Sequence, residues 1–309
     1  MSILVTGGTG YIGSHCVKRL LAGGKDVVAV DLVARSFQED FPNTRLYVGD
    51  IRDSALMETI MQNEQIDAVM HFAAWSLVGE SVQNPGKYFR NNVDGAASLL
   101  DSMVAHGVQY IVFSSTAATY GEPRNTPIIE TDPQVPTNPY GASKRMVEEM
   151  LQWYAEIYGI SYCALRYFNV AGAWPDGSIG EAHAPETHII PLVLQAAKGE
   201  REYVTIYGDD YPTPDGTCIR DYIHVCDLIE SHVQALDFMR RGGGCAAFNL
   251  GIGRGFSVKE VIEAAKAVTG VDIPVRVGAR RAGDPSVLVA SGEKARELLG
   301  FAPKHLSPE

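Results

Sequence analysis

A tyrosine stands four residues before a lysine in the stretch NPYGASK, Asn138 to Lys144. Thr137 and Asn138 can cap a helix at this point, and Pro139 suits the first helical position. Tyr140 and Lys144 would then be neighbours on one face of that helix. An ammonium beside a phenol stabilises the phenolate, so the pair could act as a general base near neutral pH. An amphipathic helix with a surface tyrosine and a solvated lysine explains the same residues, and the rest of the chain has to decide.

A second stretch with chemical potential is GGTGYIG, Gly7 to Gly13, which lies between a strand-like run and a helical pattern. Glycines at such a junction permit a tight turn and let backbone N–H groups approach a pyrophosphate at the helix N-terminus. Asp31 follows Gly13 by 18 residues, where a carboxylate binds an adenosine ribose and repels a 2′-phosphate. The pattern predicts a dinucleotide site that prefers NAD over NADP. A surface aspartate that caps a loop is the alternative for Asp31, and Arg35 nearby would suit a 2′-phosphate.

Short apolar runs and helical patterns alternate through the first half of the chain and must position these groups. The strand candidates are Ile3–Thr6, Val27–Val30, Leu46–Val48, Ala68–Phe72, Tyr110–Ser114 and Tyr162–Tyr167. The helix candidates are Ile12–Leu21, Ala55–Gln62, Val93–His106 and Tyr140–Tyr158. The strands are almost continuously apolar, which is typical of a parallel sheet covered on both faces. The alternation predicts an α/β fold with a doubly wound parallel sheet of Rossmann type.

The pattern changes after Asn169, where VAGAWPDGSIGEAHAPETH is rich in Gly, Pro and His and is typical of a long loop. Residues 247–250 are a candidate strand that returns to the main sheet, and Ser257 with Glu260 forms a capping box before a helix. We therefore expect an NAD-binding domain from 1–171, joined by 222–252. A smaller α/β lobe for a nucleotide-sugar would consist of 172–221 and 253–309.

Composition excludes several classes of function. The chain has 309 residues, 46% of them hydrophobic and 20% charged, which describes a globular protein with a large core. Its formal net charge of −11 argues against a nucleic-acid partner or an anionic membrane surface. The 5 cysteines form no CxxC and the 8 histidines no HExxH, so we expect neither a disulfide framework nor a metal site. The N-terminus lacks a signal-type segment and no run of 18 apolar residues occurs, so we expect a cytoplasmic protein.

The stretch FSSTAATYG, Phe113 to Gly121, places the hydroxyl of Thr116 just after the fifth strand candidate. Ligands of such sheets bind at this carboxyl edge. A glycine loop, a hydroxyl after strand five and YxxxK, in this order, resemble the extended short-chain dehydrogenase/reductase superfamily. The further stretches HFAAWSLVGES, NNVDG, RYFNVAGA, PETHIIPLV, YGDDYPTPDGTCIRDYIHV and RRAGDP make the chain similar to the UDP-glucose 4-epimerases, from residue 1 to about residue 305.

The resemblance implies three sets of site residues. The catalytic set would be Tyr140 as the base, Lys144 as its electrostatic partner and Thr116 as a hydrogen-bonding group for the sugar O4. The NAD site would be lined by Gly7, Gly10, Tyr11, Ile12, Gly13, Asp31, Asp50, Ile51, Phe72, Ala73, Ala74, Asn91, Lys144 and Phe168. The UDP-hexose would contact Thr116, Tyr140, Asn169, His188, Ile189, Thr205, Tyr207, Arg220, Arg281, Asp284 and Leu288.

Arginine guanidinium forms paired, charge-assisted bonds to phosphate oxygens, so Arg220 and Arg281 suit a diphosphate. Salt bridges of these arginines with Asp221 and Asp284 are the structural alternative.

The resemblance also implies a reaction, in which tyrosinate takes the proton of the sugar 4-hydroxyl while C4 gives hydride to NAD. The resulting 4-keto sugar would turn in the pocket and take the hydride back on its other face. An unperturbed phenol titrates at about 10, so we expect Lys144 and an oxidised nicotinamide to lower the pKa of Tyr140. A homodimer through 93–106 and 140–158 is implied as well.

Relatives with other reactions place acidic residues after the strand-five hydroxyl, where this chain has Ala117 and Ala118. Neither alanine can move a proton, so dehydration is disfavoured. Leucine at position 288 is intermediate between residues that restrict the substrate to unacetylated sugars and small ones that admit N-acetyl groups, so action on UDP-N-acetylhexosamines stays open. A non-catalytic NAD-binding regulator is the other alternative, and the presence of both Tyr140 and Lys144 argues against it.

Overall fold

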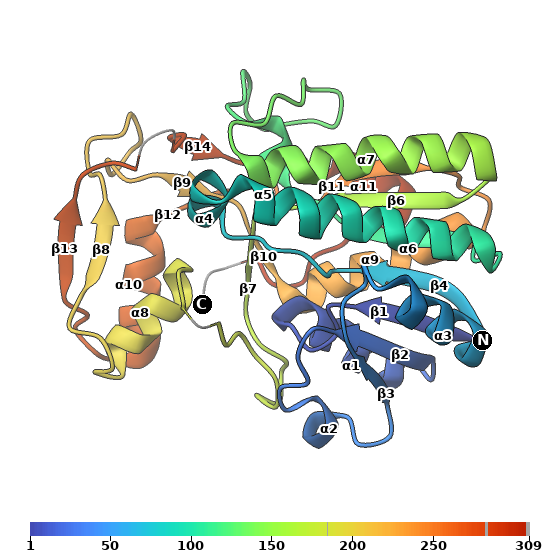
Figure 1. Ribbon diagram of the computed structural model, residues 1–309. Coiled ribbons are helices and arrows are strands. Elements are labelled where there is room, and N and C mark those ends of the chain that lie inside the picture. The colour runs from blue at the N-terminus through green and yellow to red at the C-terminus, as the bar shows by residue number, and fades with distance from the viewer. Residues whose placement is uncertain (184, 282–283, 307–309) are drawn as a thin grey trace.

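A parallel sheet of seven strands forms the centre of the computed structural model, which describes residues 1–183, 185–281 and 284–306 (Figure 1). The strand order is β11-β6-β5-β4-β1-β2-β3, and each neighbouring pair is parallel. The strands are β1 (Ser2–Thr6), β2 (Asp26–Asp31), β3 (Arg45–Val48), β4 (Ile66–His71), β5 (Tyr110–Ser114), β6 (Ser161–Arg166) and β11 (Ala246–Asn249). The predicted doubly wound α/β fold is confirmed, and so is the return of the segment near residue 247 to the main sheet beside β6.

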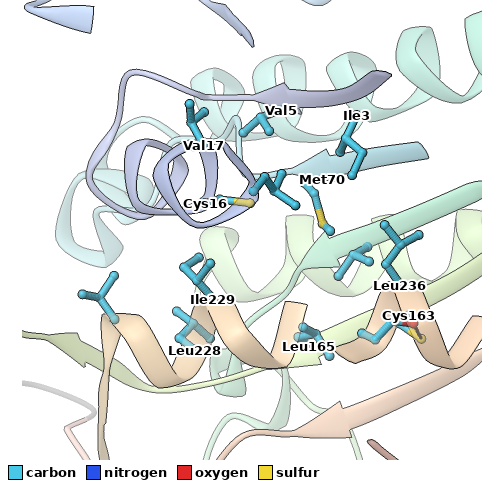
Figure 2. Packing of buried hydrophobic residues seen from close by; sticks show 14 of the residues in the cluster. Ile3, Val5, Cys16, Val17, Met70, Cys163, Leu165, Leu228, Ile229 and Leu236 are labelled. Carbon is cyan, nitrogen blue, oxygen red and sulfur yellow. Dashed lines mark hydrogen bonds between the residues drawn. The ribbon is translucent and has the colours of Figure 1, made fainter. Parts of the chain in front are cut away.

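Helices cover both faces of this sheet. The helices α1 (Tyr11–Ala22) and α9 (Val225–Arg240) pack on one face, where Val17, Leu228 and Met70 belong to the same buried cluster (Figure 2). The other face is covered by α3 (Ser54–Glu64), α6 (Asp94–Ala105) and α7 (Pro139–Tyr158) over a second cluster. Burial on both faces explains why the strand candidates are apolar without alternation.

Smaller sheets and helices lie to one side of the central sheet (Figure 1). β8 (Val204–Tyr207) pairs in parallel with β13 (Val275–Gly278). The helices α8 (Ile189–Ala197) and α10 (Val258–Thr269) share a small apolar cluster with β8 and with Ile273, which precedes β13. The capping box predicted for Ser257 and Glu260 is confirmed at the start of α10. The other short strands are β7 (Asn169–Ala171), β9 (Ile219–Arg220), β10 (Tyr222–His224), β12 (Phe256–Ser257) and β14 (Val287–Leu288). The division into a cofactor domain and a substrate lobe at the boundaries given above stays a proposal.

Several short elements were not predicted because they carry too few residues for a periodic pattern. They are α2 (Phe37–Asp40), α4 (Val78–Gln83), α5 (Pro85–Tyr88), a π-helix (Phe89–Val93), a 3₁₀-helix (Ala117–Tyr120) and α11 (Glu293–Leu299). None of the helices that the structure describes combines the length and the apolar character needed to cross a membrane.

Two histidines buried against the sheet predict sensitivity to acid. Burial lowers the pKa of His232 to about 4 and that of His71 to about 3, whereas both would titrate near 6.5 in the unfolded chain. Between about pH 6.5 and 4 these two side chains therefore bind up to two more protons in the unfolded chain than in the folded one. Their contribution to the free energy of unfolding should then fall by up to about 3 kcal/mol per unit as the pH drops through this window.

Urea unfolding at a series of pH values measures this slope. The ring of His232 packs against Phe72, with 4.8 Å between ring centroids, and its Nε2 has no hydrogen-bond partner among the described residues. His232→Phe should therefore reduce by one the number of extra protons that the unfolded chain binds. The slope of the unfolding free energy against pH should then decrease by about 1.4 kcal/mol per pH unit. Parallel pH dependences for the variant and the wild type would contradict the assignment.

Candidate active site

Tyr140 and Lys144 lie in the first turns of α7, beside the carboxyl end of β5. Asn138 caps the helix, because its Oδ1 accepts a hydrogen bond from the Gly141 N–H at 2.8 Å. Lys144 is only 3% exposed, and its Nζ donates to the Ser114 carbonyl oxygen at 2.8 Å. The predicted helix and its cap are therefore confirmed, and the surface lysine of the alternative interpretation is wrong.

The tyrosine and the strand-five hydroxyl meet at the same place. The Thr116 side chain lies beside the Tyr140 phenol and acts to lower its pKa. Thr116 follows β5 and caps the 3₁₀-helix by accepting from the Ala118 N–H at 3.1 Å. The Tyr140 ring also makes an edge contact with Tyr88, with centroids 6.5 Å apart. The structure thus brings Tyr140, Thr116 and Lys144 together, although they come from different elements.

The pKa of Tyr140 is raised in the chain alone. Burial raises it to about 12, and the Thr116 side chain offsets only part of this effect. Burial also lowers the pKa of Lys144 to about 7, despite the opposing charge of Glu148. The lowering of the Tyr140 pKa by Lys144 together with an oxidised nicotinamide stays a prediction.

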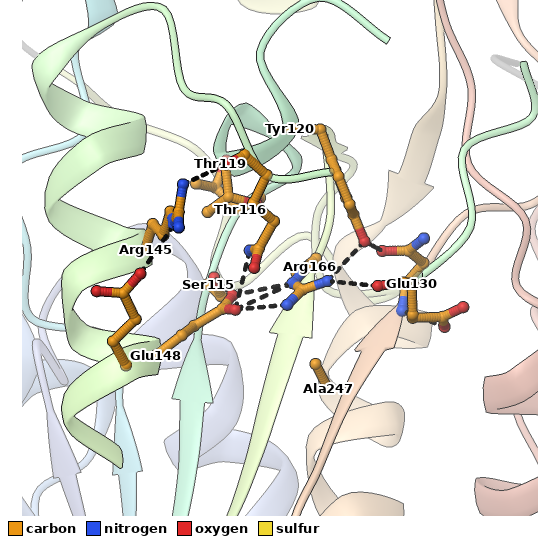
Figure 3. A network of polar contacts seen from close by, with 12 residues as sticks. Ser115, Thr116, Thr119, Tyr120, Glu130, Arg145, Glu148, Arg166 and Ala247 are labelled. Atoms are coloured by element: carbon orange, nitrogen blue, oxygen red, sulfur yellow. Dashed lines mark hydrogen bonds and ion pairs between the residues drawn. The ribbon is translucent and has the colours of Figure 1, made fainter. Parts of the chain in front are cut away.

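A buried polar network supports this end of β5 (Figure 3). The Nε of Arg166, at the end of β6, donates to both carboxylate oxygens of Glu148 at 3.0 and 3.2 Å. Ser115 donates to the same carboxylate, and Nη1 of Arg166 donates to the Tyr120 hydroxyl at 2.7 Å. Ser115 stands between the carbonyl that holds Lys144 and the hydroxyl of Thr116, so the network fixes the backbone that carries both.

The glycine loop has the geometry of an anion site. Gly7 has φ +72°, and a Cβ there would lie 2.7 Å from the Ala73 nitrogen. A Cβ on Gly13 would lie 2.0 Å from the Gly7 carbonyl oxygen. No side chain of the described residues caps the first turn of α1 after Gly10, which leaves its N–H groups directed at the loop. Asp31, at the end of β2, accepts from the Thr9 N–H at 3.1 Å. A close-packed backbone, an uncapped helix N-terminus and this carboxylate fit a pyrophosphate with an adjoining ribose.

The other residues expected around a cofactor lie mostly in segments that follow the strand ends. Tyr11 is buried, and its hydroxyl donates to the Gly172 carbonyl at 2.6 Å. The Asp50 carboxylate is bound by Arg52, with Nε to Oδ2 at 2.9 Å, which lowers the pKa of Asp50. The members not yet described are Ile12 in α1, Ile51 after β3, Phe72, Ala73 and Ala74 after β4, Asn91 in the π-helix and Phe168 after β6. Their binding roles stay predictions.

Asn92 is a residue that the sequence prediction missed. It is buried in the π-helix, and its Nδ2 donates to the Trp75 carbonyl and to the Ser143 hydroxyl, both at 3.0 Å. Ser143 in turn donates to the Tyr140 carbonyl at 2.7 Å. Asn92 therefore anchors the turn of α7 that carries Tyr140. The stretch NNVDG holds both asparagines, and its sequence alone does not show which of them turns into the protein.

The residues expected around a diphosphate also meet. Arg220 forms an ion pair with Asp284, and the Arg281 guanidinium lies over the Tyr207 ring, 4.2 Å from its centroid. Thr205 and Tyr207 share β8. The ion-pair alternative is thus present for Arg220, with Asp284 as its partner. Asp221 instead accepts backbone N–H groups of Ile252 and Ala290, both at 3.2 Å.

The remaining residues predicted to contact the UDP-hexose lie in β7, at the start of α8 and in β14. Asn169 begins β7, and His188 stands directly before Ile189, the first residue of α8. Leu288 in β14 stands opposite Arg220 in the sheet register and packs with Phe168 against Ala117. Leu288 therefore contacts the segment that follows the strand-five hydroxyl.

Comparison with known proteins gives consistent results. Residues 3–251 match the model of the NAD dependent epimerase/dehydratase family. A UDP-glucose 4-epimerase of Lacticaseibacillus casei is 55% identical over 306 residues, which cover 99% of this chain and 92% of that protein. The crystal structure of a Brucella ovis UDP-glucose 4-epimerase in complex with NAD superimposes with a TM-score of 0.94 at 48% identity, covering 98% of this chain and 93% of that one. A Bifidobacterium longum UDP-glucose 4-epimerase in complex with NAD+ and UDP gives a TM-score of 0.93 at 40% identity, covering 99% and 94%.

Proposed function

Since the chain belongs to the NAD dependent epimerase/dehydratase family, we propose that it is an isomerase that interconverts UDP-galactose and UDP-glucose with NAD as its bound cofactor. The observation that carries the proposal is the meeting of Tyr140, Thr116 and Lys144 beside the glycine loop. Identity of 55% to a UDP-glucose 4-epimerase over nearly the whole chain supports the choice of substrate. Ala117 and Ala118 offer no acid or base for the expulsion of water, which separates the proposal from dehydration.

Each residue of the site has a definite task in this reaction. Tyr140 takes the proton from the sugar 4-hydroxyl and returns it later, while the Thr116 hydroxyl orients the phenol oxygen and the sugar O4. Lys144, held by Ser114, supplies positive charge that favours the phenolate. Bound NAD supplies the reversible redox chemistry that converts C4 of the sugar to a ketone and back. Because the phenol alone has a pKa of about 12, the base becomes effective only when positive charge is close to it.

The cofactor would lie along the glycine loop, with its pyrophosphate at the N-terminus of α1 and a ribose at Asp31. Gly13→Ala tests this placement, because the added Cβ would lie 2.0 Å from a backbone oxygen of the loop. Overpacking of this kind costs about 1–3 kcal/mol, so we expect NAD affinity to fall about 10- to 100-fold. Calorimetric titration of the NAD-free protein measures the affinity.

Gly23→Ala at the other end of α1 is the matched control. Its Cβ would lie 3.1 Å from the movable end of Arg19 and in ordinary contact with the backbone oxygens of Leu20 and Arg19, at 3.4 and 3.5 Å. The affinity of this variant for NAD should therefore equal that of the wild type. Equal affinities for all three proteins would contradict the proposed position of the pyrophosphate.

At the other end of the site, Arg220 and Arg281 would bind the diphosphate of the UDP-hexose. Arg220, which is paired with Asp284 in the chain alone, would bind phosphate oxygens either in place of Asp284 or together with it. Recognition concentrated on the nucleotide lets the hexose turn while the nucleotide stays bound.

We also propose a homodimer formed through α6 and α7. The exposed face of α7 carries large apolar side chains, namely Met146, Trp153, Ile157 and Tyr158. Such a face is typical of a partner surface. Light scattering after gel filtration decides the oligomeric state. A cytoplasmic location completes the proposal, because free thiols such as the 5 cysteines stay reduced there.

The function is tested by incubation of the purified protein with UDP-galactose alone, followed by chromatographic separation of the sugar nucleotides. Formation of UDP-glucose up to a constant ratio, approached equally from UDP-glucose, is the expected result. An unchanged substrate in the presence of saturating NAD would overturn the proposal.

A second substrate class is favoured by one observation, the partly buried Leu288 that packs against the cluster of Ala117, Tyr120 and Ile128. Leucine is smaller than tyrosine, so a pocket wall formed by Leu288 leaves room for an N-acetyl group. We expect the wild type to turn over UDP-N-acetylglucosamine as well. In Leu288→Tyr, the turnover of this sugar relative to that of UDP-glucose should fall by about 10-fold or more, because added bulk in a packed site costs about 1–3 kcal/mol. No turnover of the N-acetyl sugar by the wild type would remove this substrate class.

A further inference from the structure

Four side chains near the start of α8 converge on one point, and one of them, His188, is also among the residues predicted to contact the UDP-hexose. Glu181, His183, Glu186 and His188 each offer one ligand atom, and these atoms all lie within 4.8 Å of one another. Nδ1 of His188 is 2.8 Å from Glu181 Oε1 and 3.0 Å from Glu186 Oε1. Nδ1 of His183 is 3.1 Å from Glu181 Oε1 and 3.7 Å from Glu186 Oε2. These four residues are named the Glu/His cluster.

Simple hydrogen bonds account for only two of the four nitrogen–oxygen approaches in this geometry. Each imidazole Nδ1 carries at most one hydrogen, so two nitrogens can supply two hydrogens to four nitrogen–oxygen approaches. The same oxygen of Glu181 faces both rings, and Nδ1 of His188 faces both carboxylates at 3.0 Å or less. Donor atoms that all face a common centre are the arrangement found around a cation.

The charge of the cluster leads to the same conclusion. The side chains of Glu181 and Glu186 are only 9% and 6% exposed. Two carboxylates so close together and so far from water are stabilised by positive charge beside them.

The carboxylate of Glu186 is also held in position from behind. Its Oε1 accepts the N–H groups of Thr187 at 2.7 Å and of His188 at 2.8 Å. Supporting hydrogen bonds of this kind orient the ligands of metal ions in proteins. The loop backbone therefore fixes the carboxylate before any ion arrives.

We propose that the Glu/His cluster binds one divalent cation of the Zn²⁺ type in a closed, four-ligand site. Imidazole nitrogen with carboxylate oxygen suits Zn²⁺, whereas Ca²⁺ and Mg²⁺ take oxygen ligands. Tetrahedral ligands at about 2.0–2.2 Å from zinc lie about 3.3–3.6 Å from each other. The nitrogen–oxygen separations of 2.8–3.7 Å need only small adjustments to reach this value.

The surroundings of the cluster indicate a structural role. The His183 ring makes an edge contact with Tyr11, with centroids 6.3 Å apart, and Tyr11 opens α1 directly after the glycine loop. Arg35 donates to the Ala182 carbonyl at 3.3 Å, and His188 precedes α8. A cation here would tie the loop before α8 to the segments around the glycine loop. Four protein ligands leave no open position for catalysis.

Metal content and titration of the full-length protein test the site. Protein purified without chelators should contain one zinc per chain by mass spectrometry after desalting. After removal of zinc with dipicolinate, titration with Co²⁺ should produce the intense visible bands of a tetrahedral ion that saturate at one equivalent, and Zn²⁺ should abolish them. A wild-type protein that binds no zinc, or that gives only the weak bands of octahedral Co²⁺, would overturn the proposal.

The double variant Glu181→Gln, Glu186→Gln keeps the shape of both side chains and removes their charge. Mutation of residues that only support the ligands of a metal ion lowers its affinity by about 10–100-fold. Loss of two direct carboxylate ligands should therefore weaken zinc binding by more than about 100-fold. The matched control is Glu58→Gln, which alters the pair of Glu58 with His106, 2.8 Å apart at a distant part of the surface. Zinc affinity should be unchanged in the control. Wild-type affinity in the double variant would place the ion elsewhere and end the proposal, and if that variant fails to fold, the cobalt spectrum of the wild type decides.

Discussion

Tyr140→Phe should lower the turnover of UDP-galactose by about 10²–10⁴-fold, the usual contribution of a general base. The substitution removes one oxygen and keeps the ring that contacts Tyr88, so the fold and the NAD content should stay as in the wild type. Loss of the phenol leaves no group at Thr116 that can take the proton of the 4-hydroxyl. Initial rates at saturating substrate, together with the NAD content of each preparation, measure the effect.

Tyr154→Phe is the matched control on the same helix. Its hydroxyl donates to Asp101 at 2.5 Å, away from Thr116, so turnover should be unchanged. Full activity of Tyr140→Phe would show that the proton leaves by another route, and the proposed mechanism would then be wrong.

Glu148→Gln should cost about 3–5 kcal/mol of stability, because it leaves the buried guanidinium of Arg166 without its counter-charge. Both partners are almost fully buried, and the ion pair joins α7 to the end of β6 (Figure 3). The same substitution removes the charge that opposes the lowering of the Lys144 pKa. The pKa of the lysine should therefore fall further, so activity at neutral pH should drop together with stability.

Urea unfolding of three proteins distinguishes the loss of the ion pair from the loss of packing. Glu148→Gln combined with Arg166→Met removes both charges and should be more stable than Glu148→Gln alone, because a buried pair often costs as much to desolvate as it returns. A single variant within about 1 kcal/mol of the wild type would show that water reaches Arg166, since exposed pairs contribute no more than this.

The sequence was sufficient for many features that depend on local pattern, although α9 (Val225–Arg240) was not among the predicted helices. β5 has the predicted bounds Tyr110–Ser114, and the other five strand candidates differ from the structure by no more than two residues at either end. Parallel strands buried on both faces produce short apolar runs that are easily recognised. The glycine loop, the helix of Tyr140 and the capping box of Ser257 also depend on neighbours in the chain, and all three were found.

Features that depend on distant residues were not predictable in this way. The partner of Arg220 is Asp284 rather than its neighbour Asp221, a choice that the fold makes by placing β14 beside β9. The direction of the Tyr140 pKa depends on how deeply the pair is buried, which the i,i+4 spacing does not reveal. The π-helix that places Asn92 against Ser143 interrupts the regular helical period and has no pattern of its own. The Glu/His cluster matches neither CxxC nor HExxH, because its glutamates and histidines alternate within a loop before α8.

The seventh strand of the central sheet comes late in the chain. β11 pairs with β6, with Ala246 opposite Cys163, and α8, β8 and α9 lie between them in the sequence. During synthesis on the ribosome, the edge of β6 would stay uncovered until most of the protein has been translated. An uncovered edge invites pairing with other chains, so translation that stalls between residues 170 and 245 should leave products prone to aggregate.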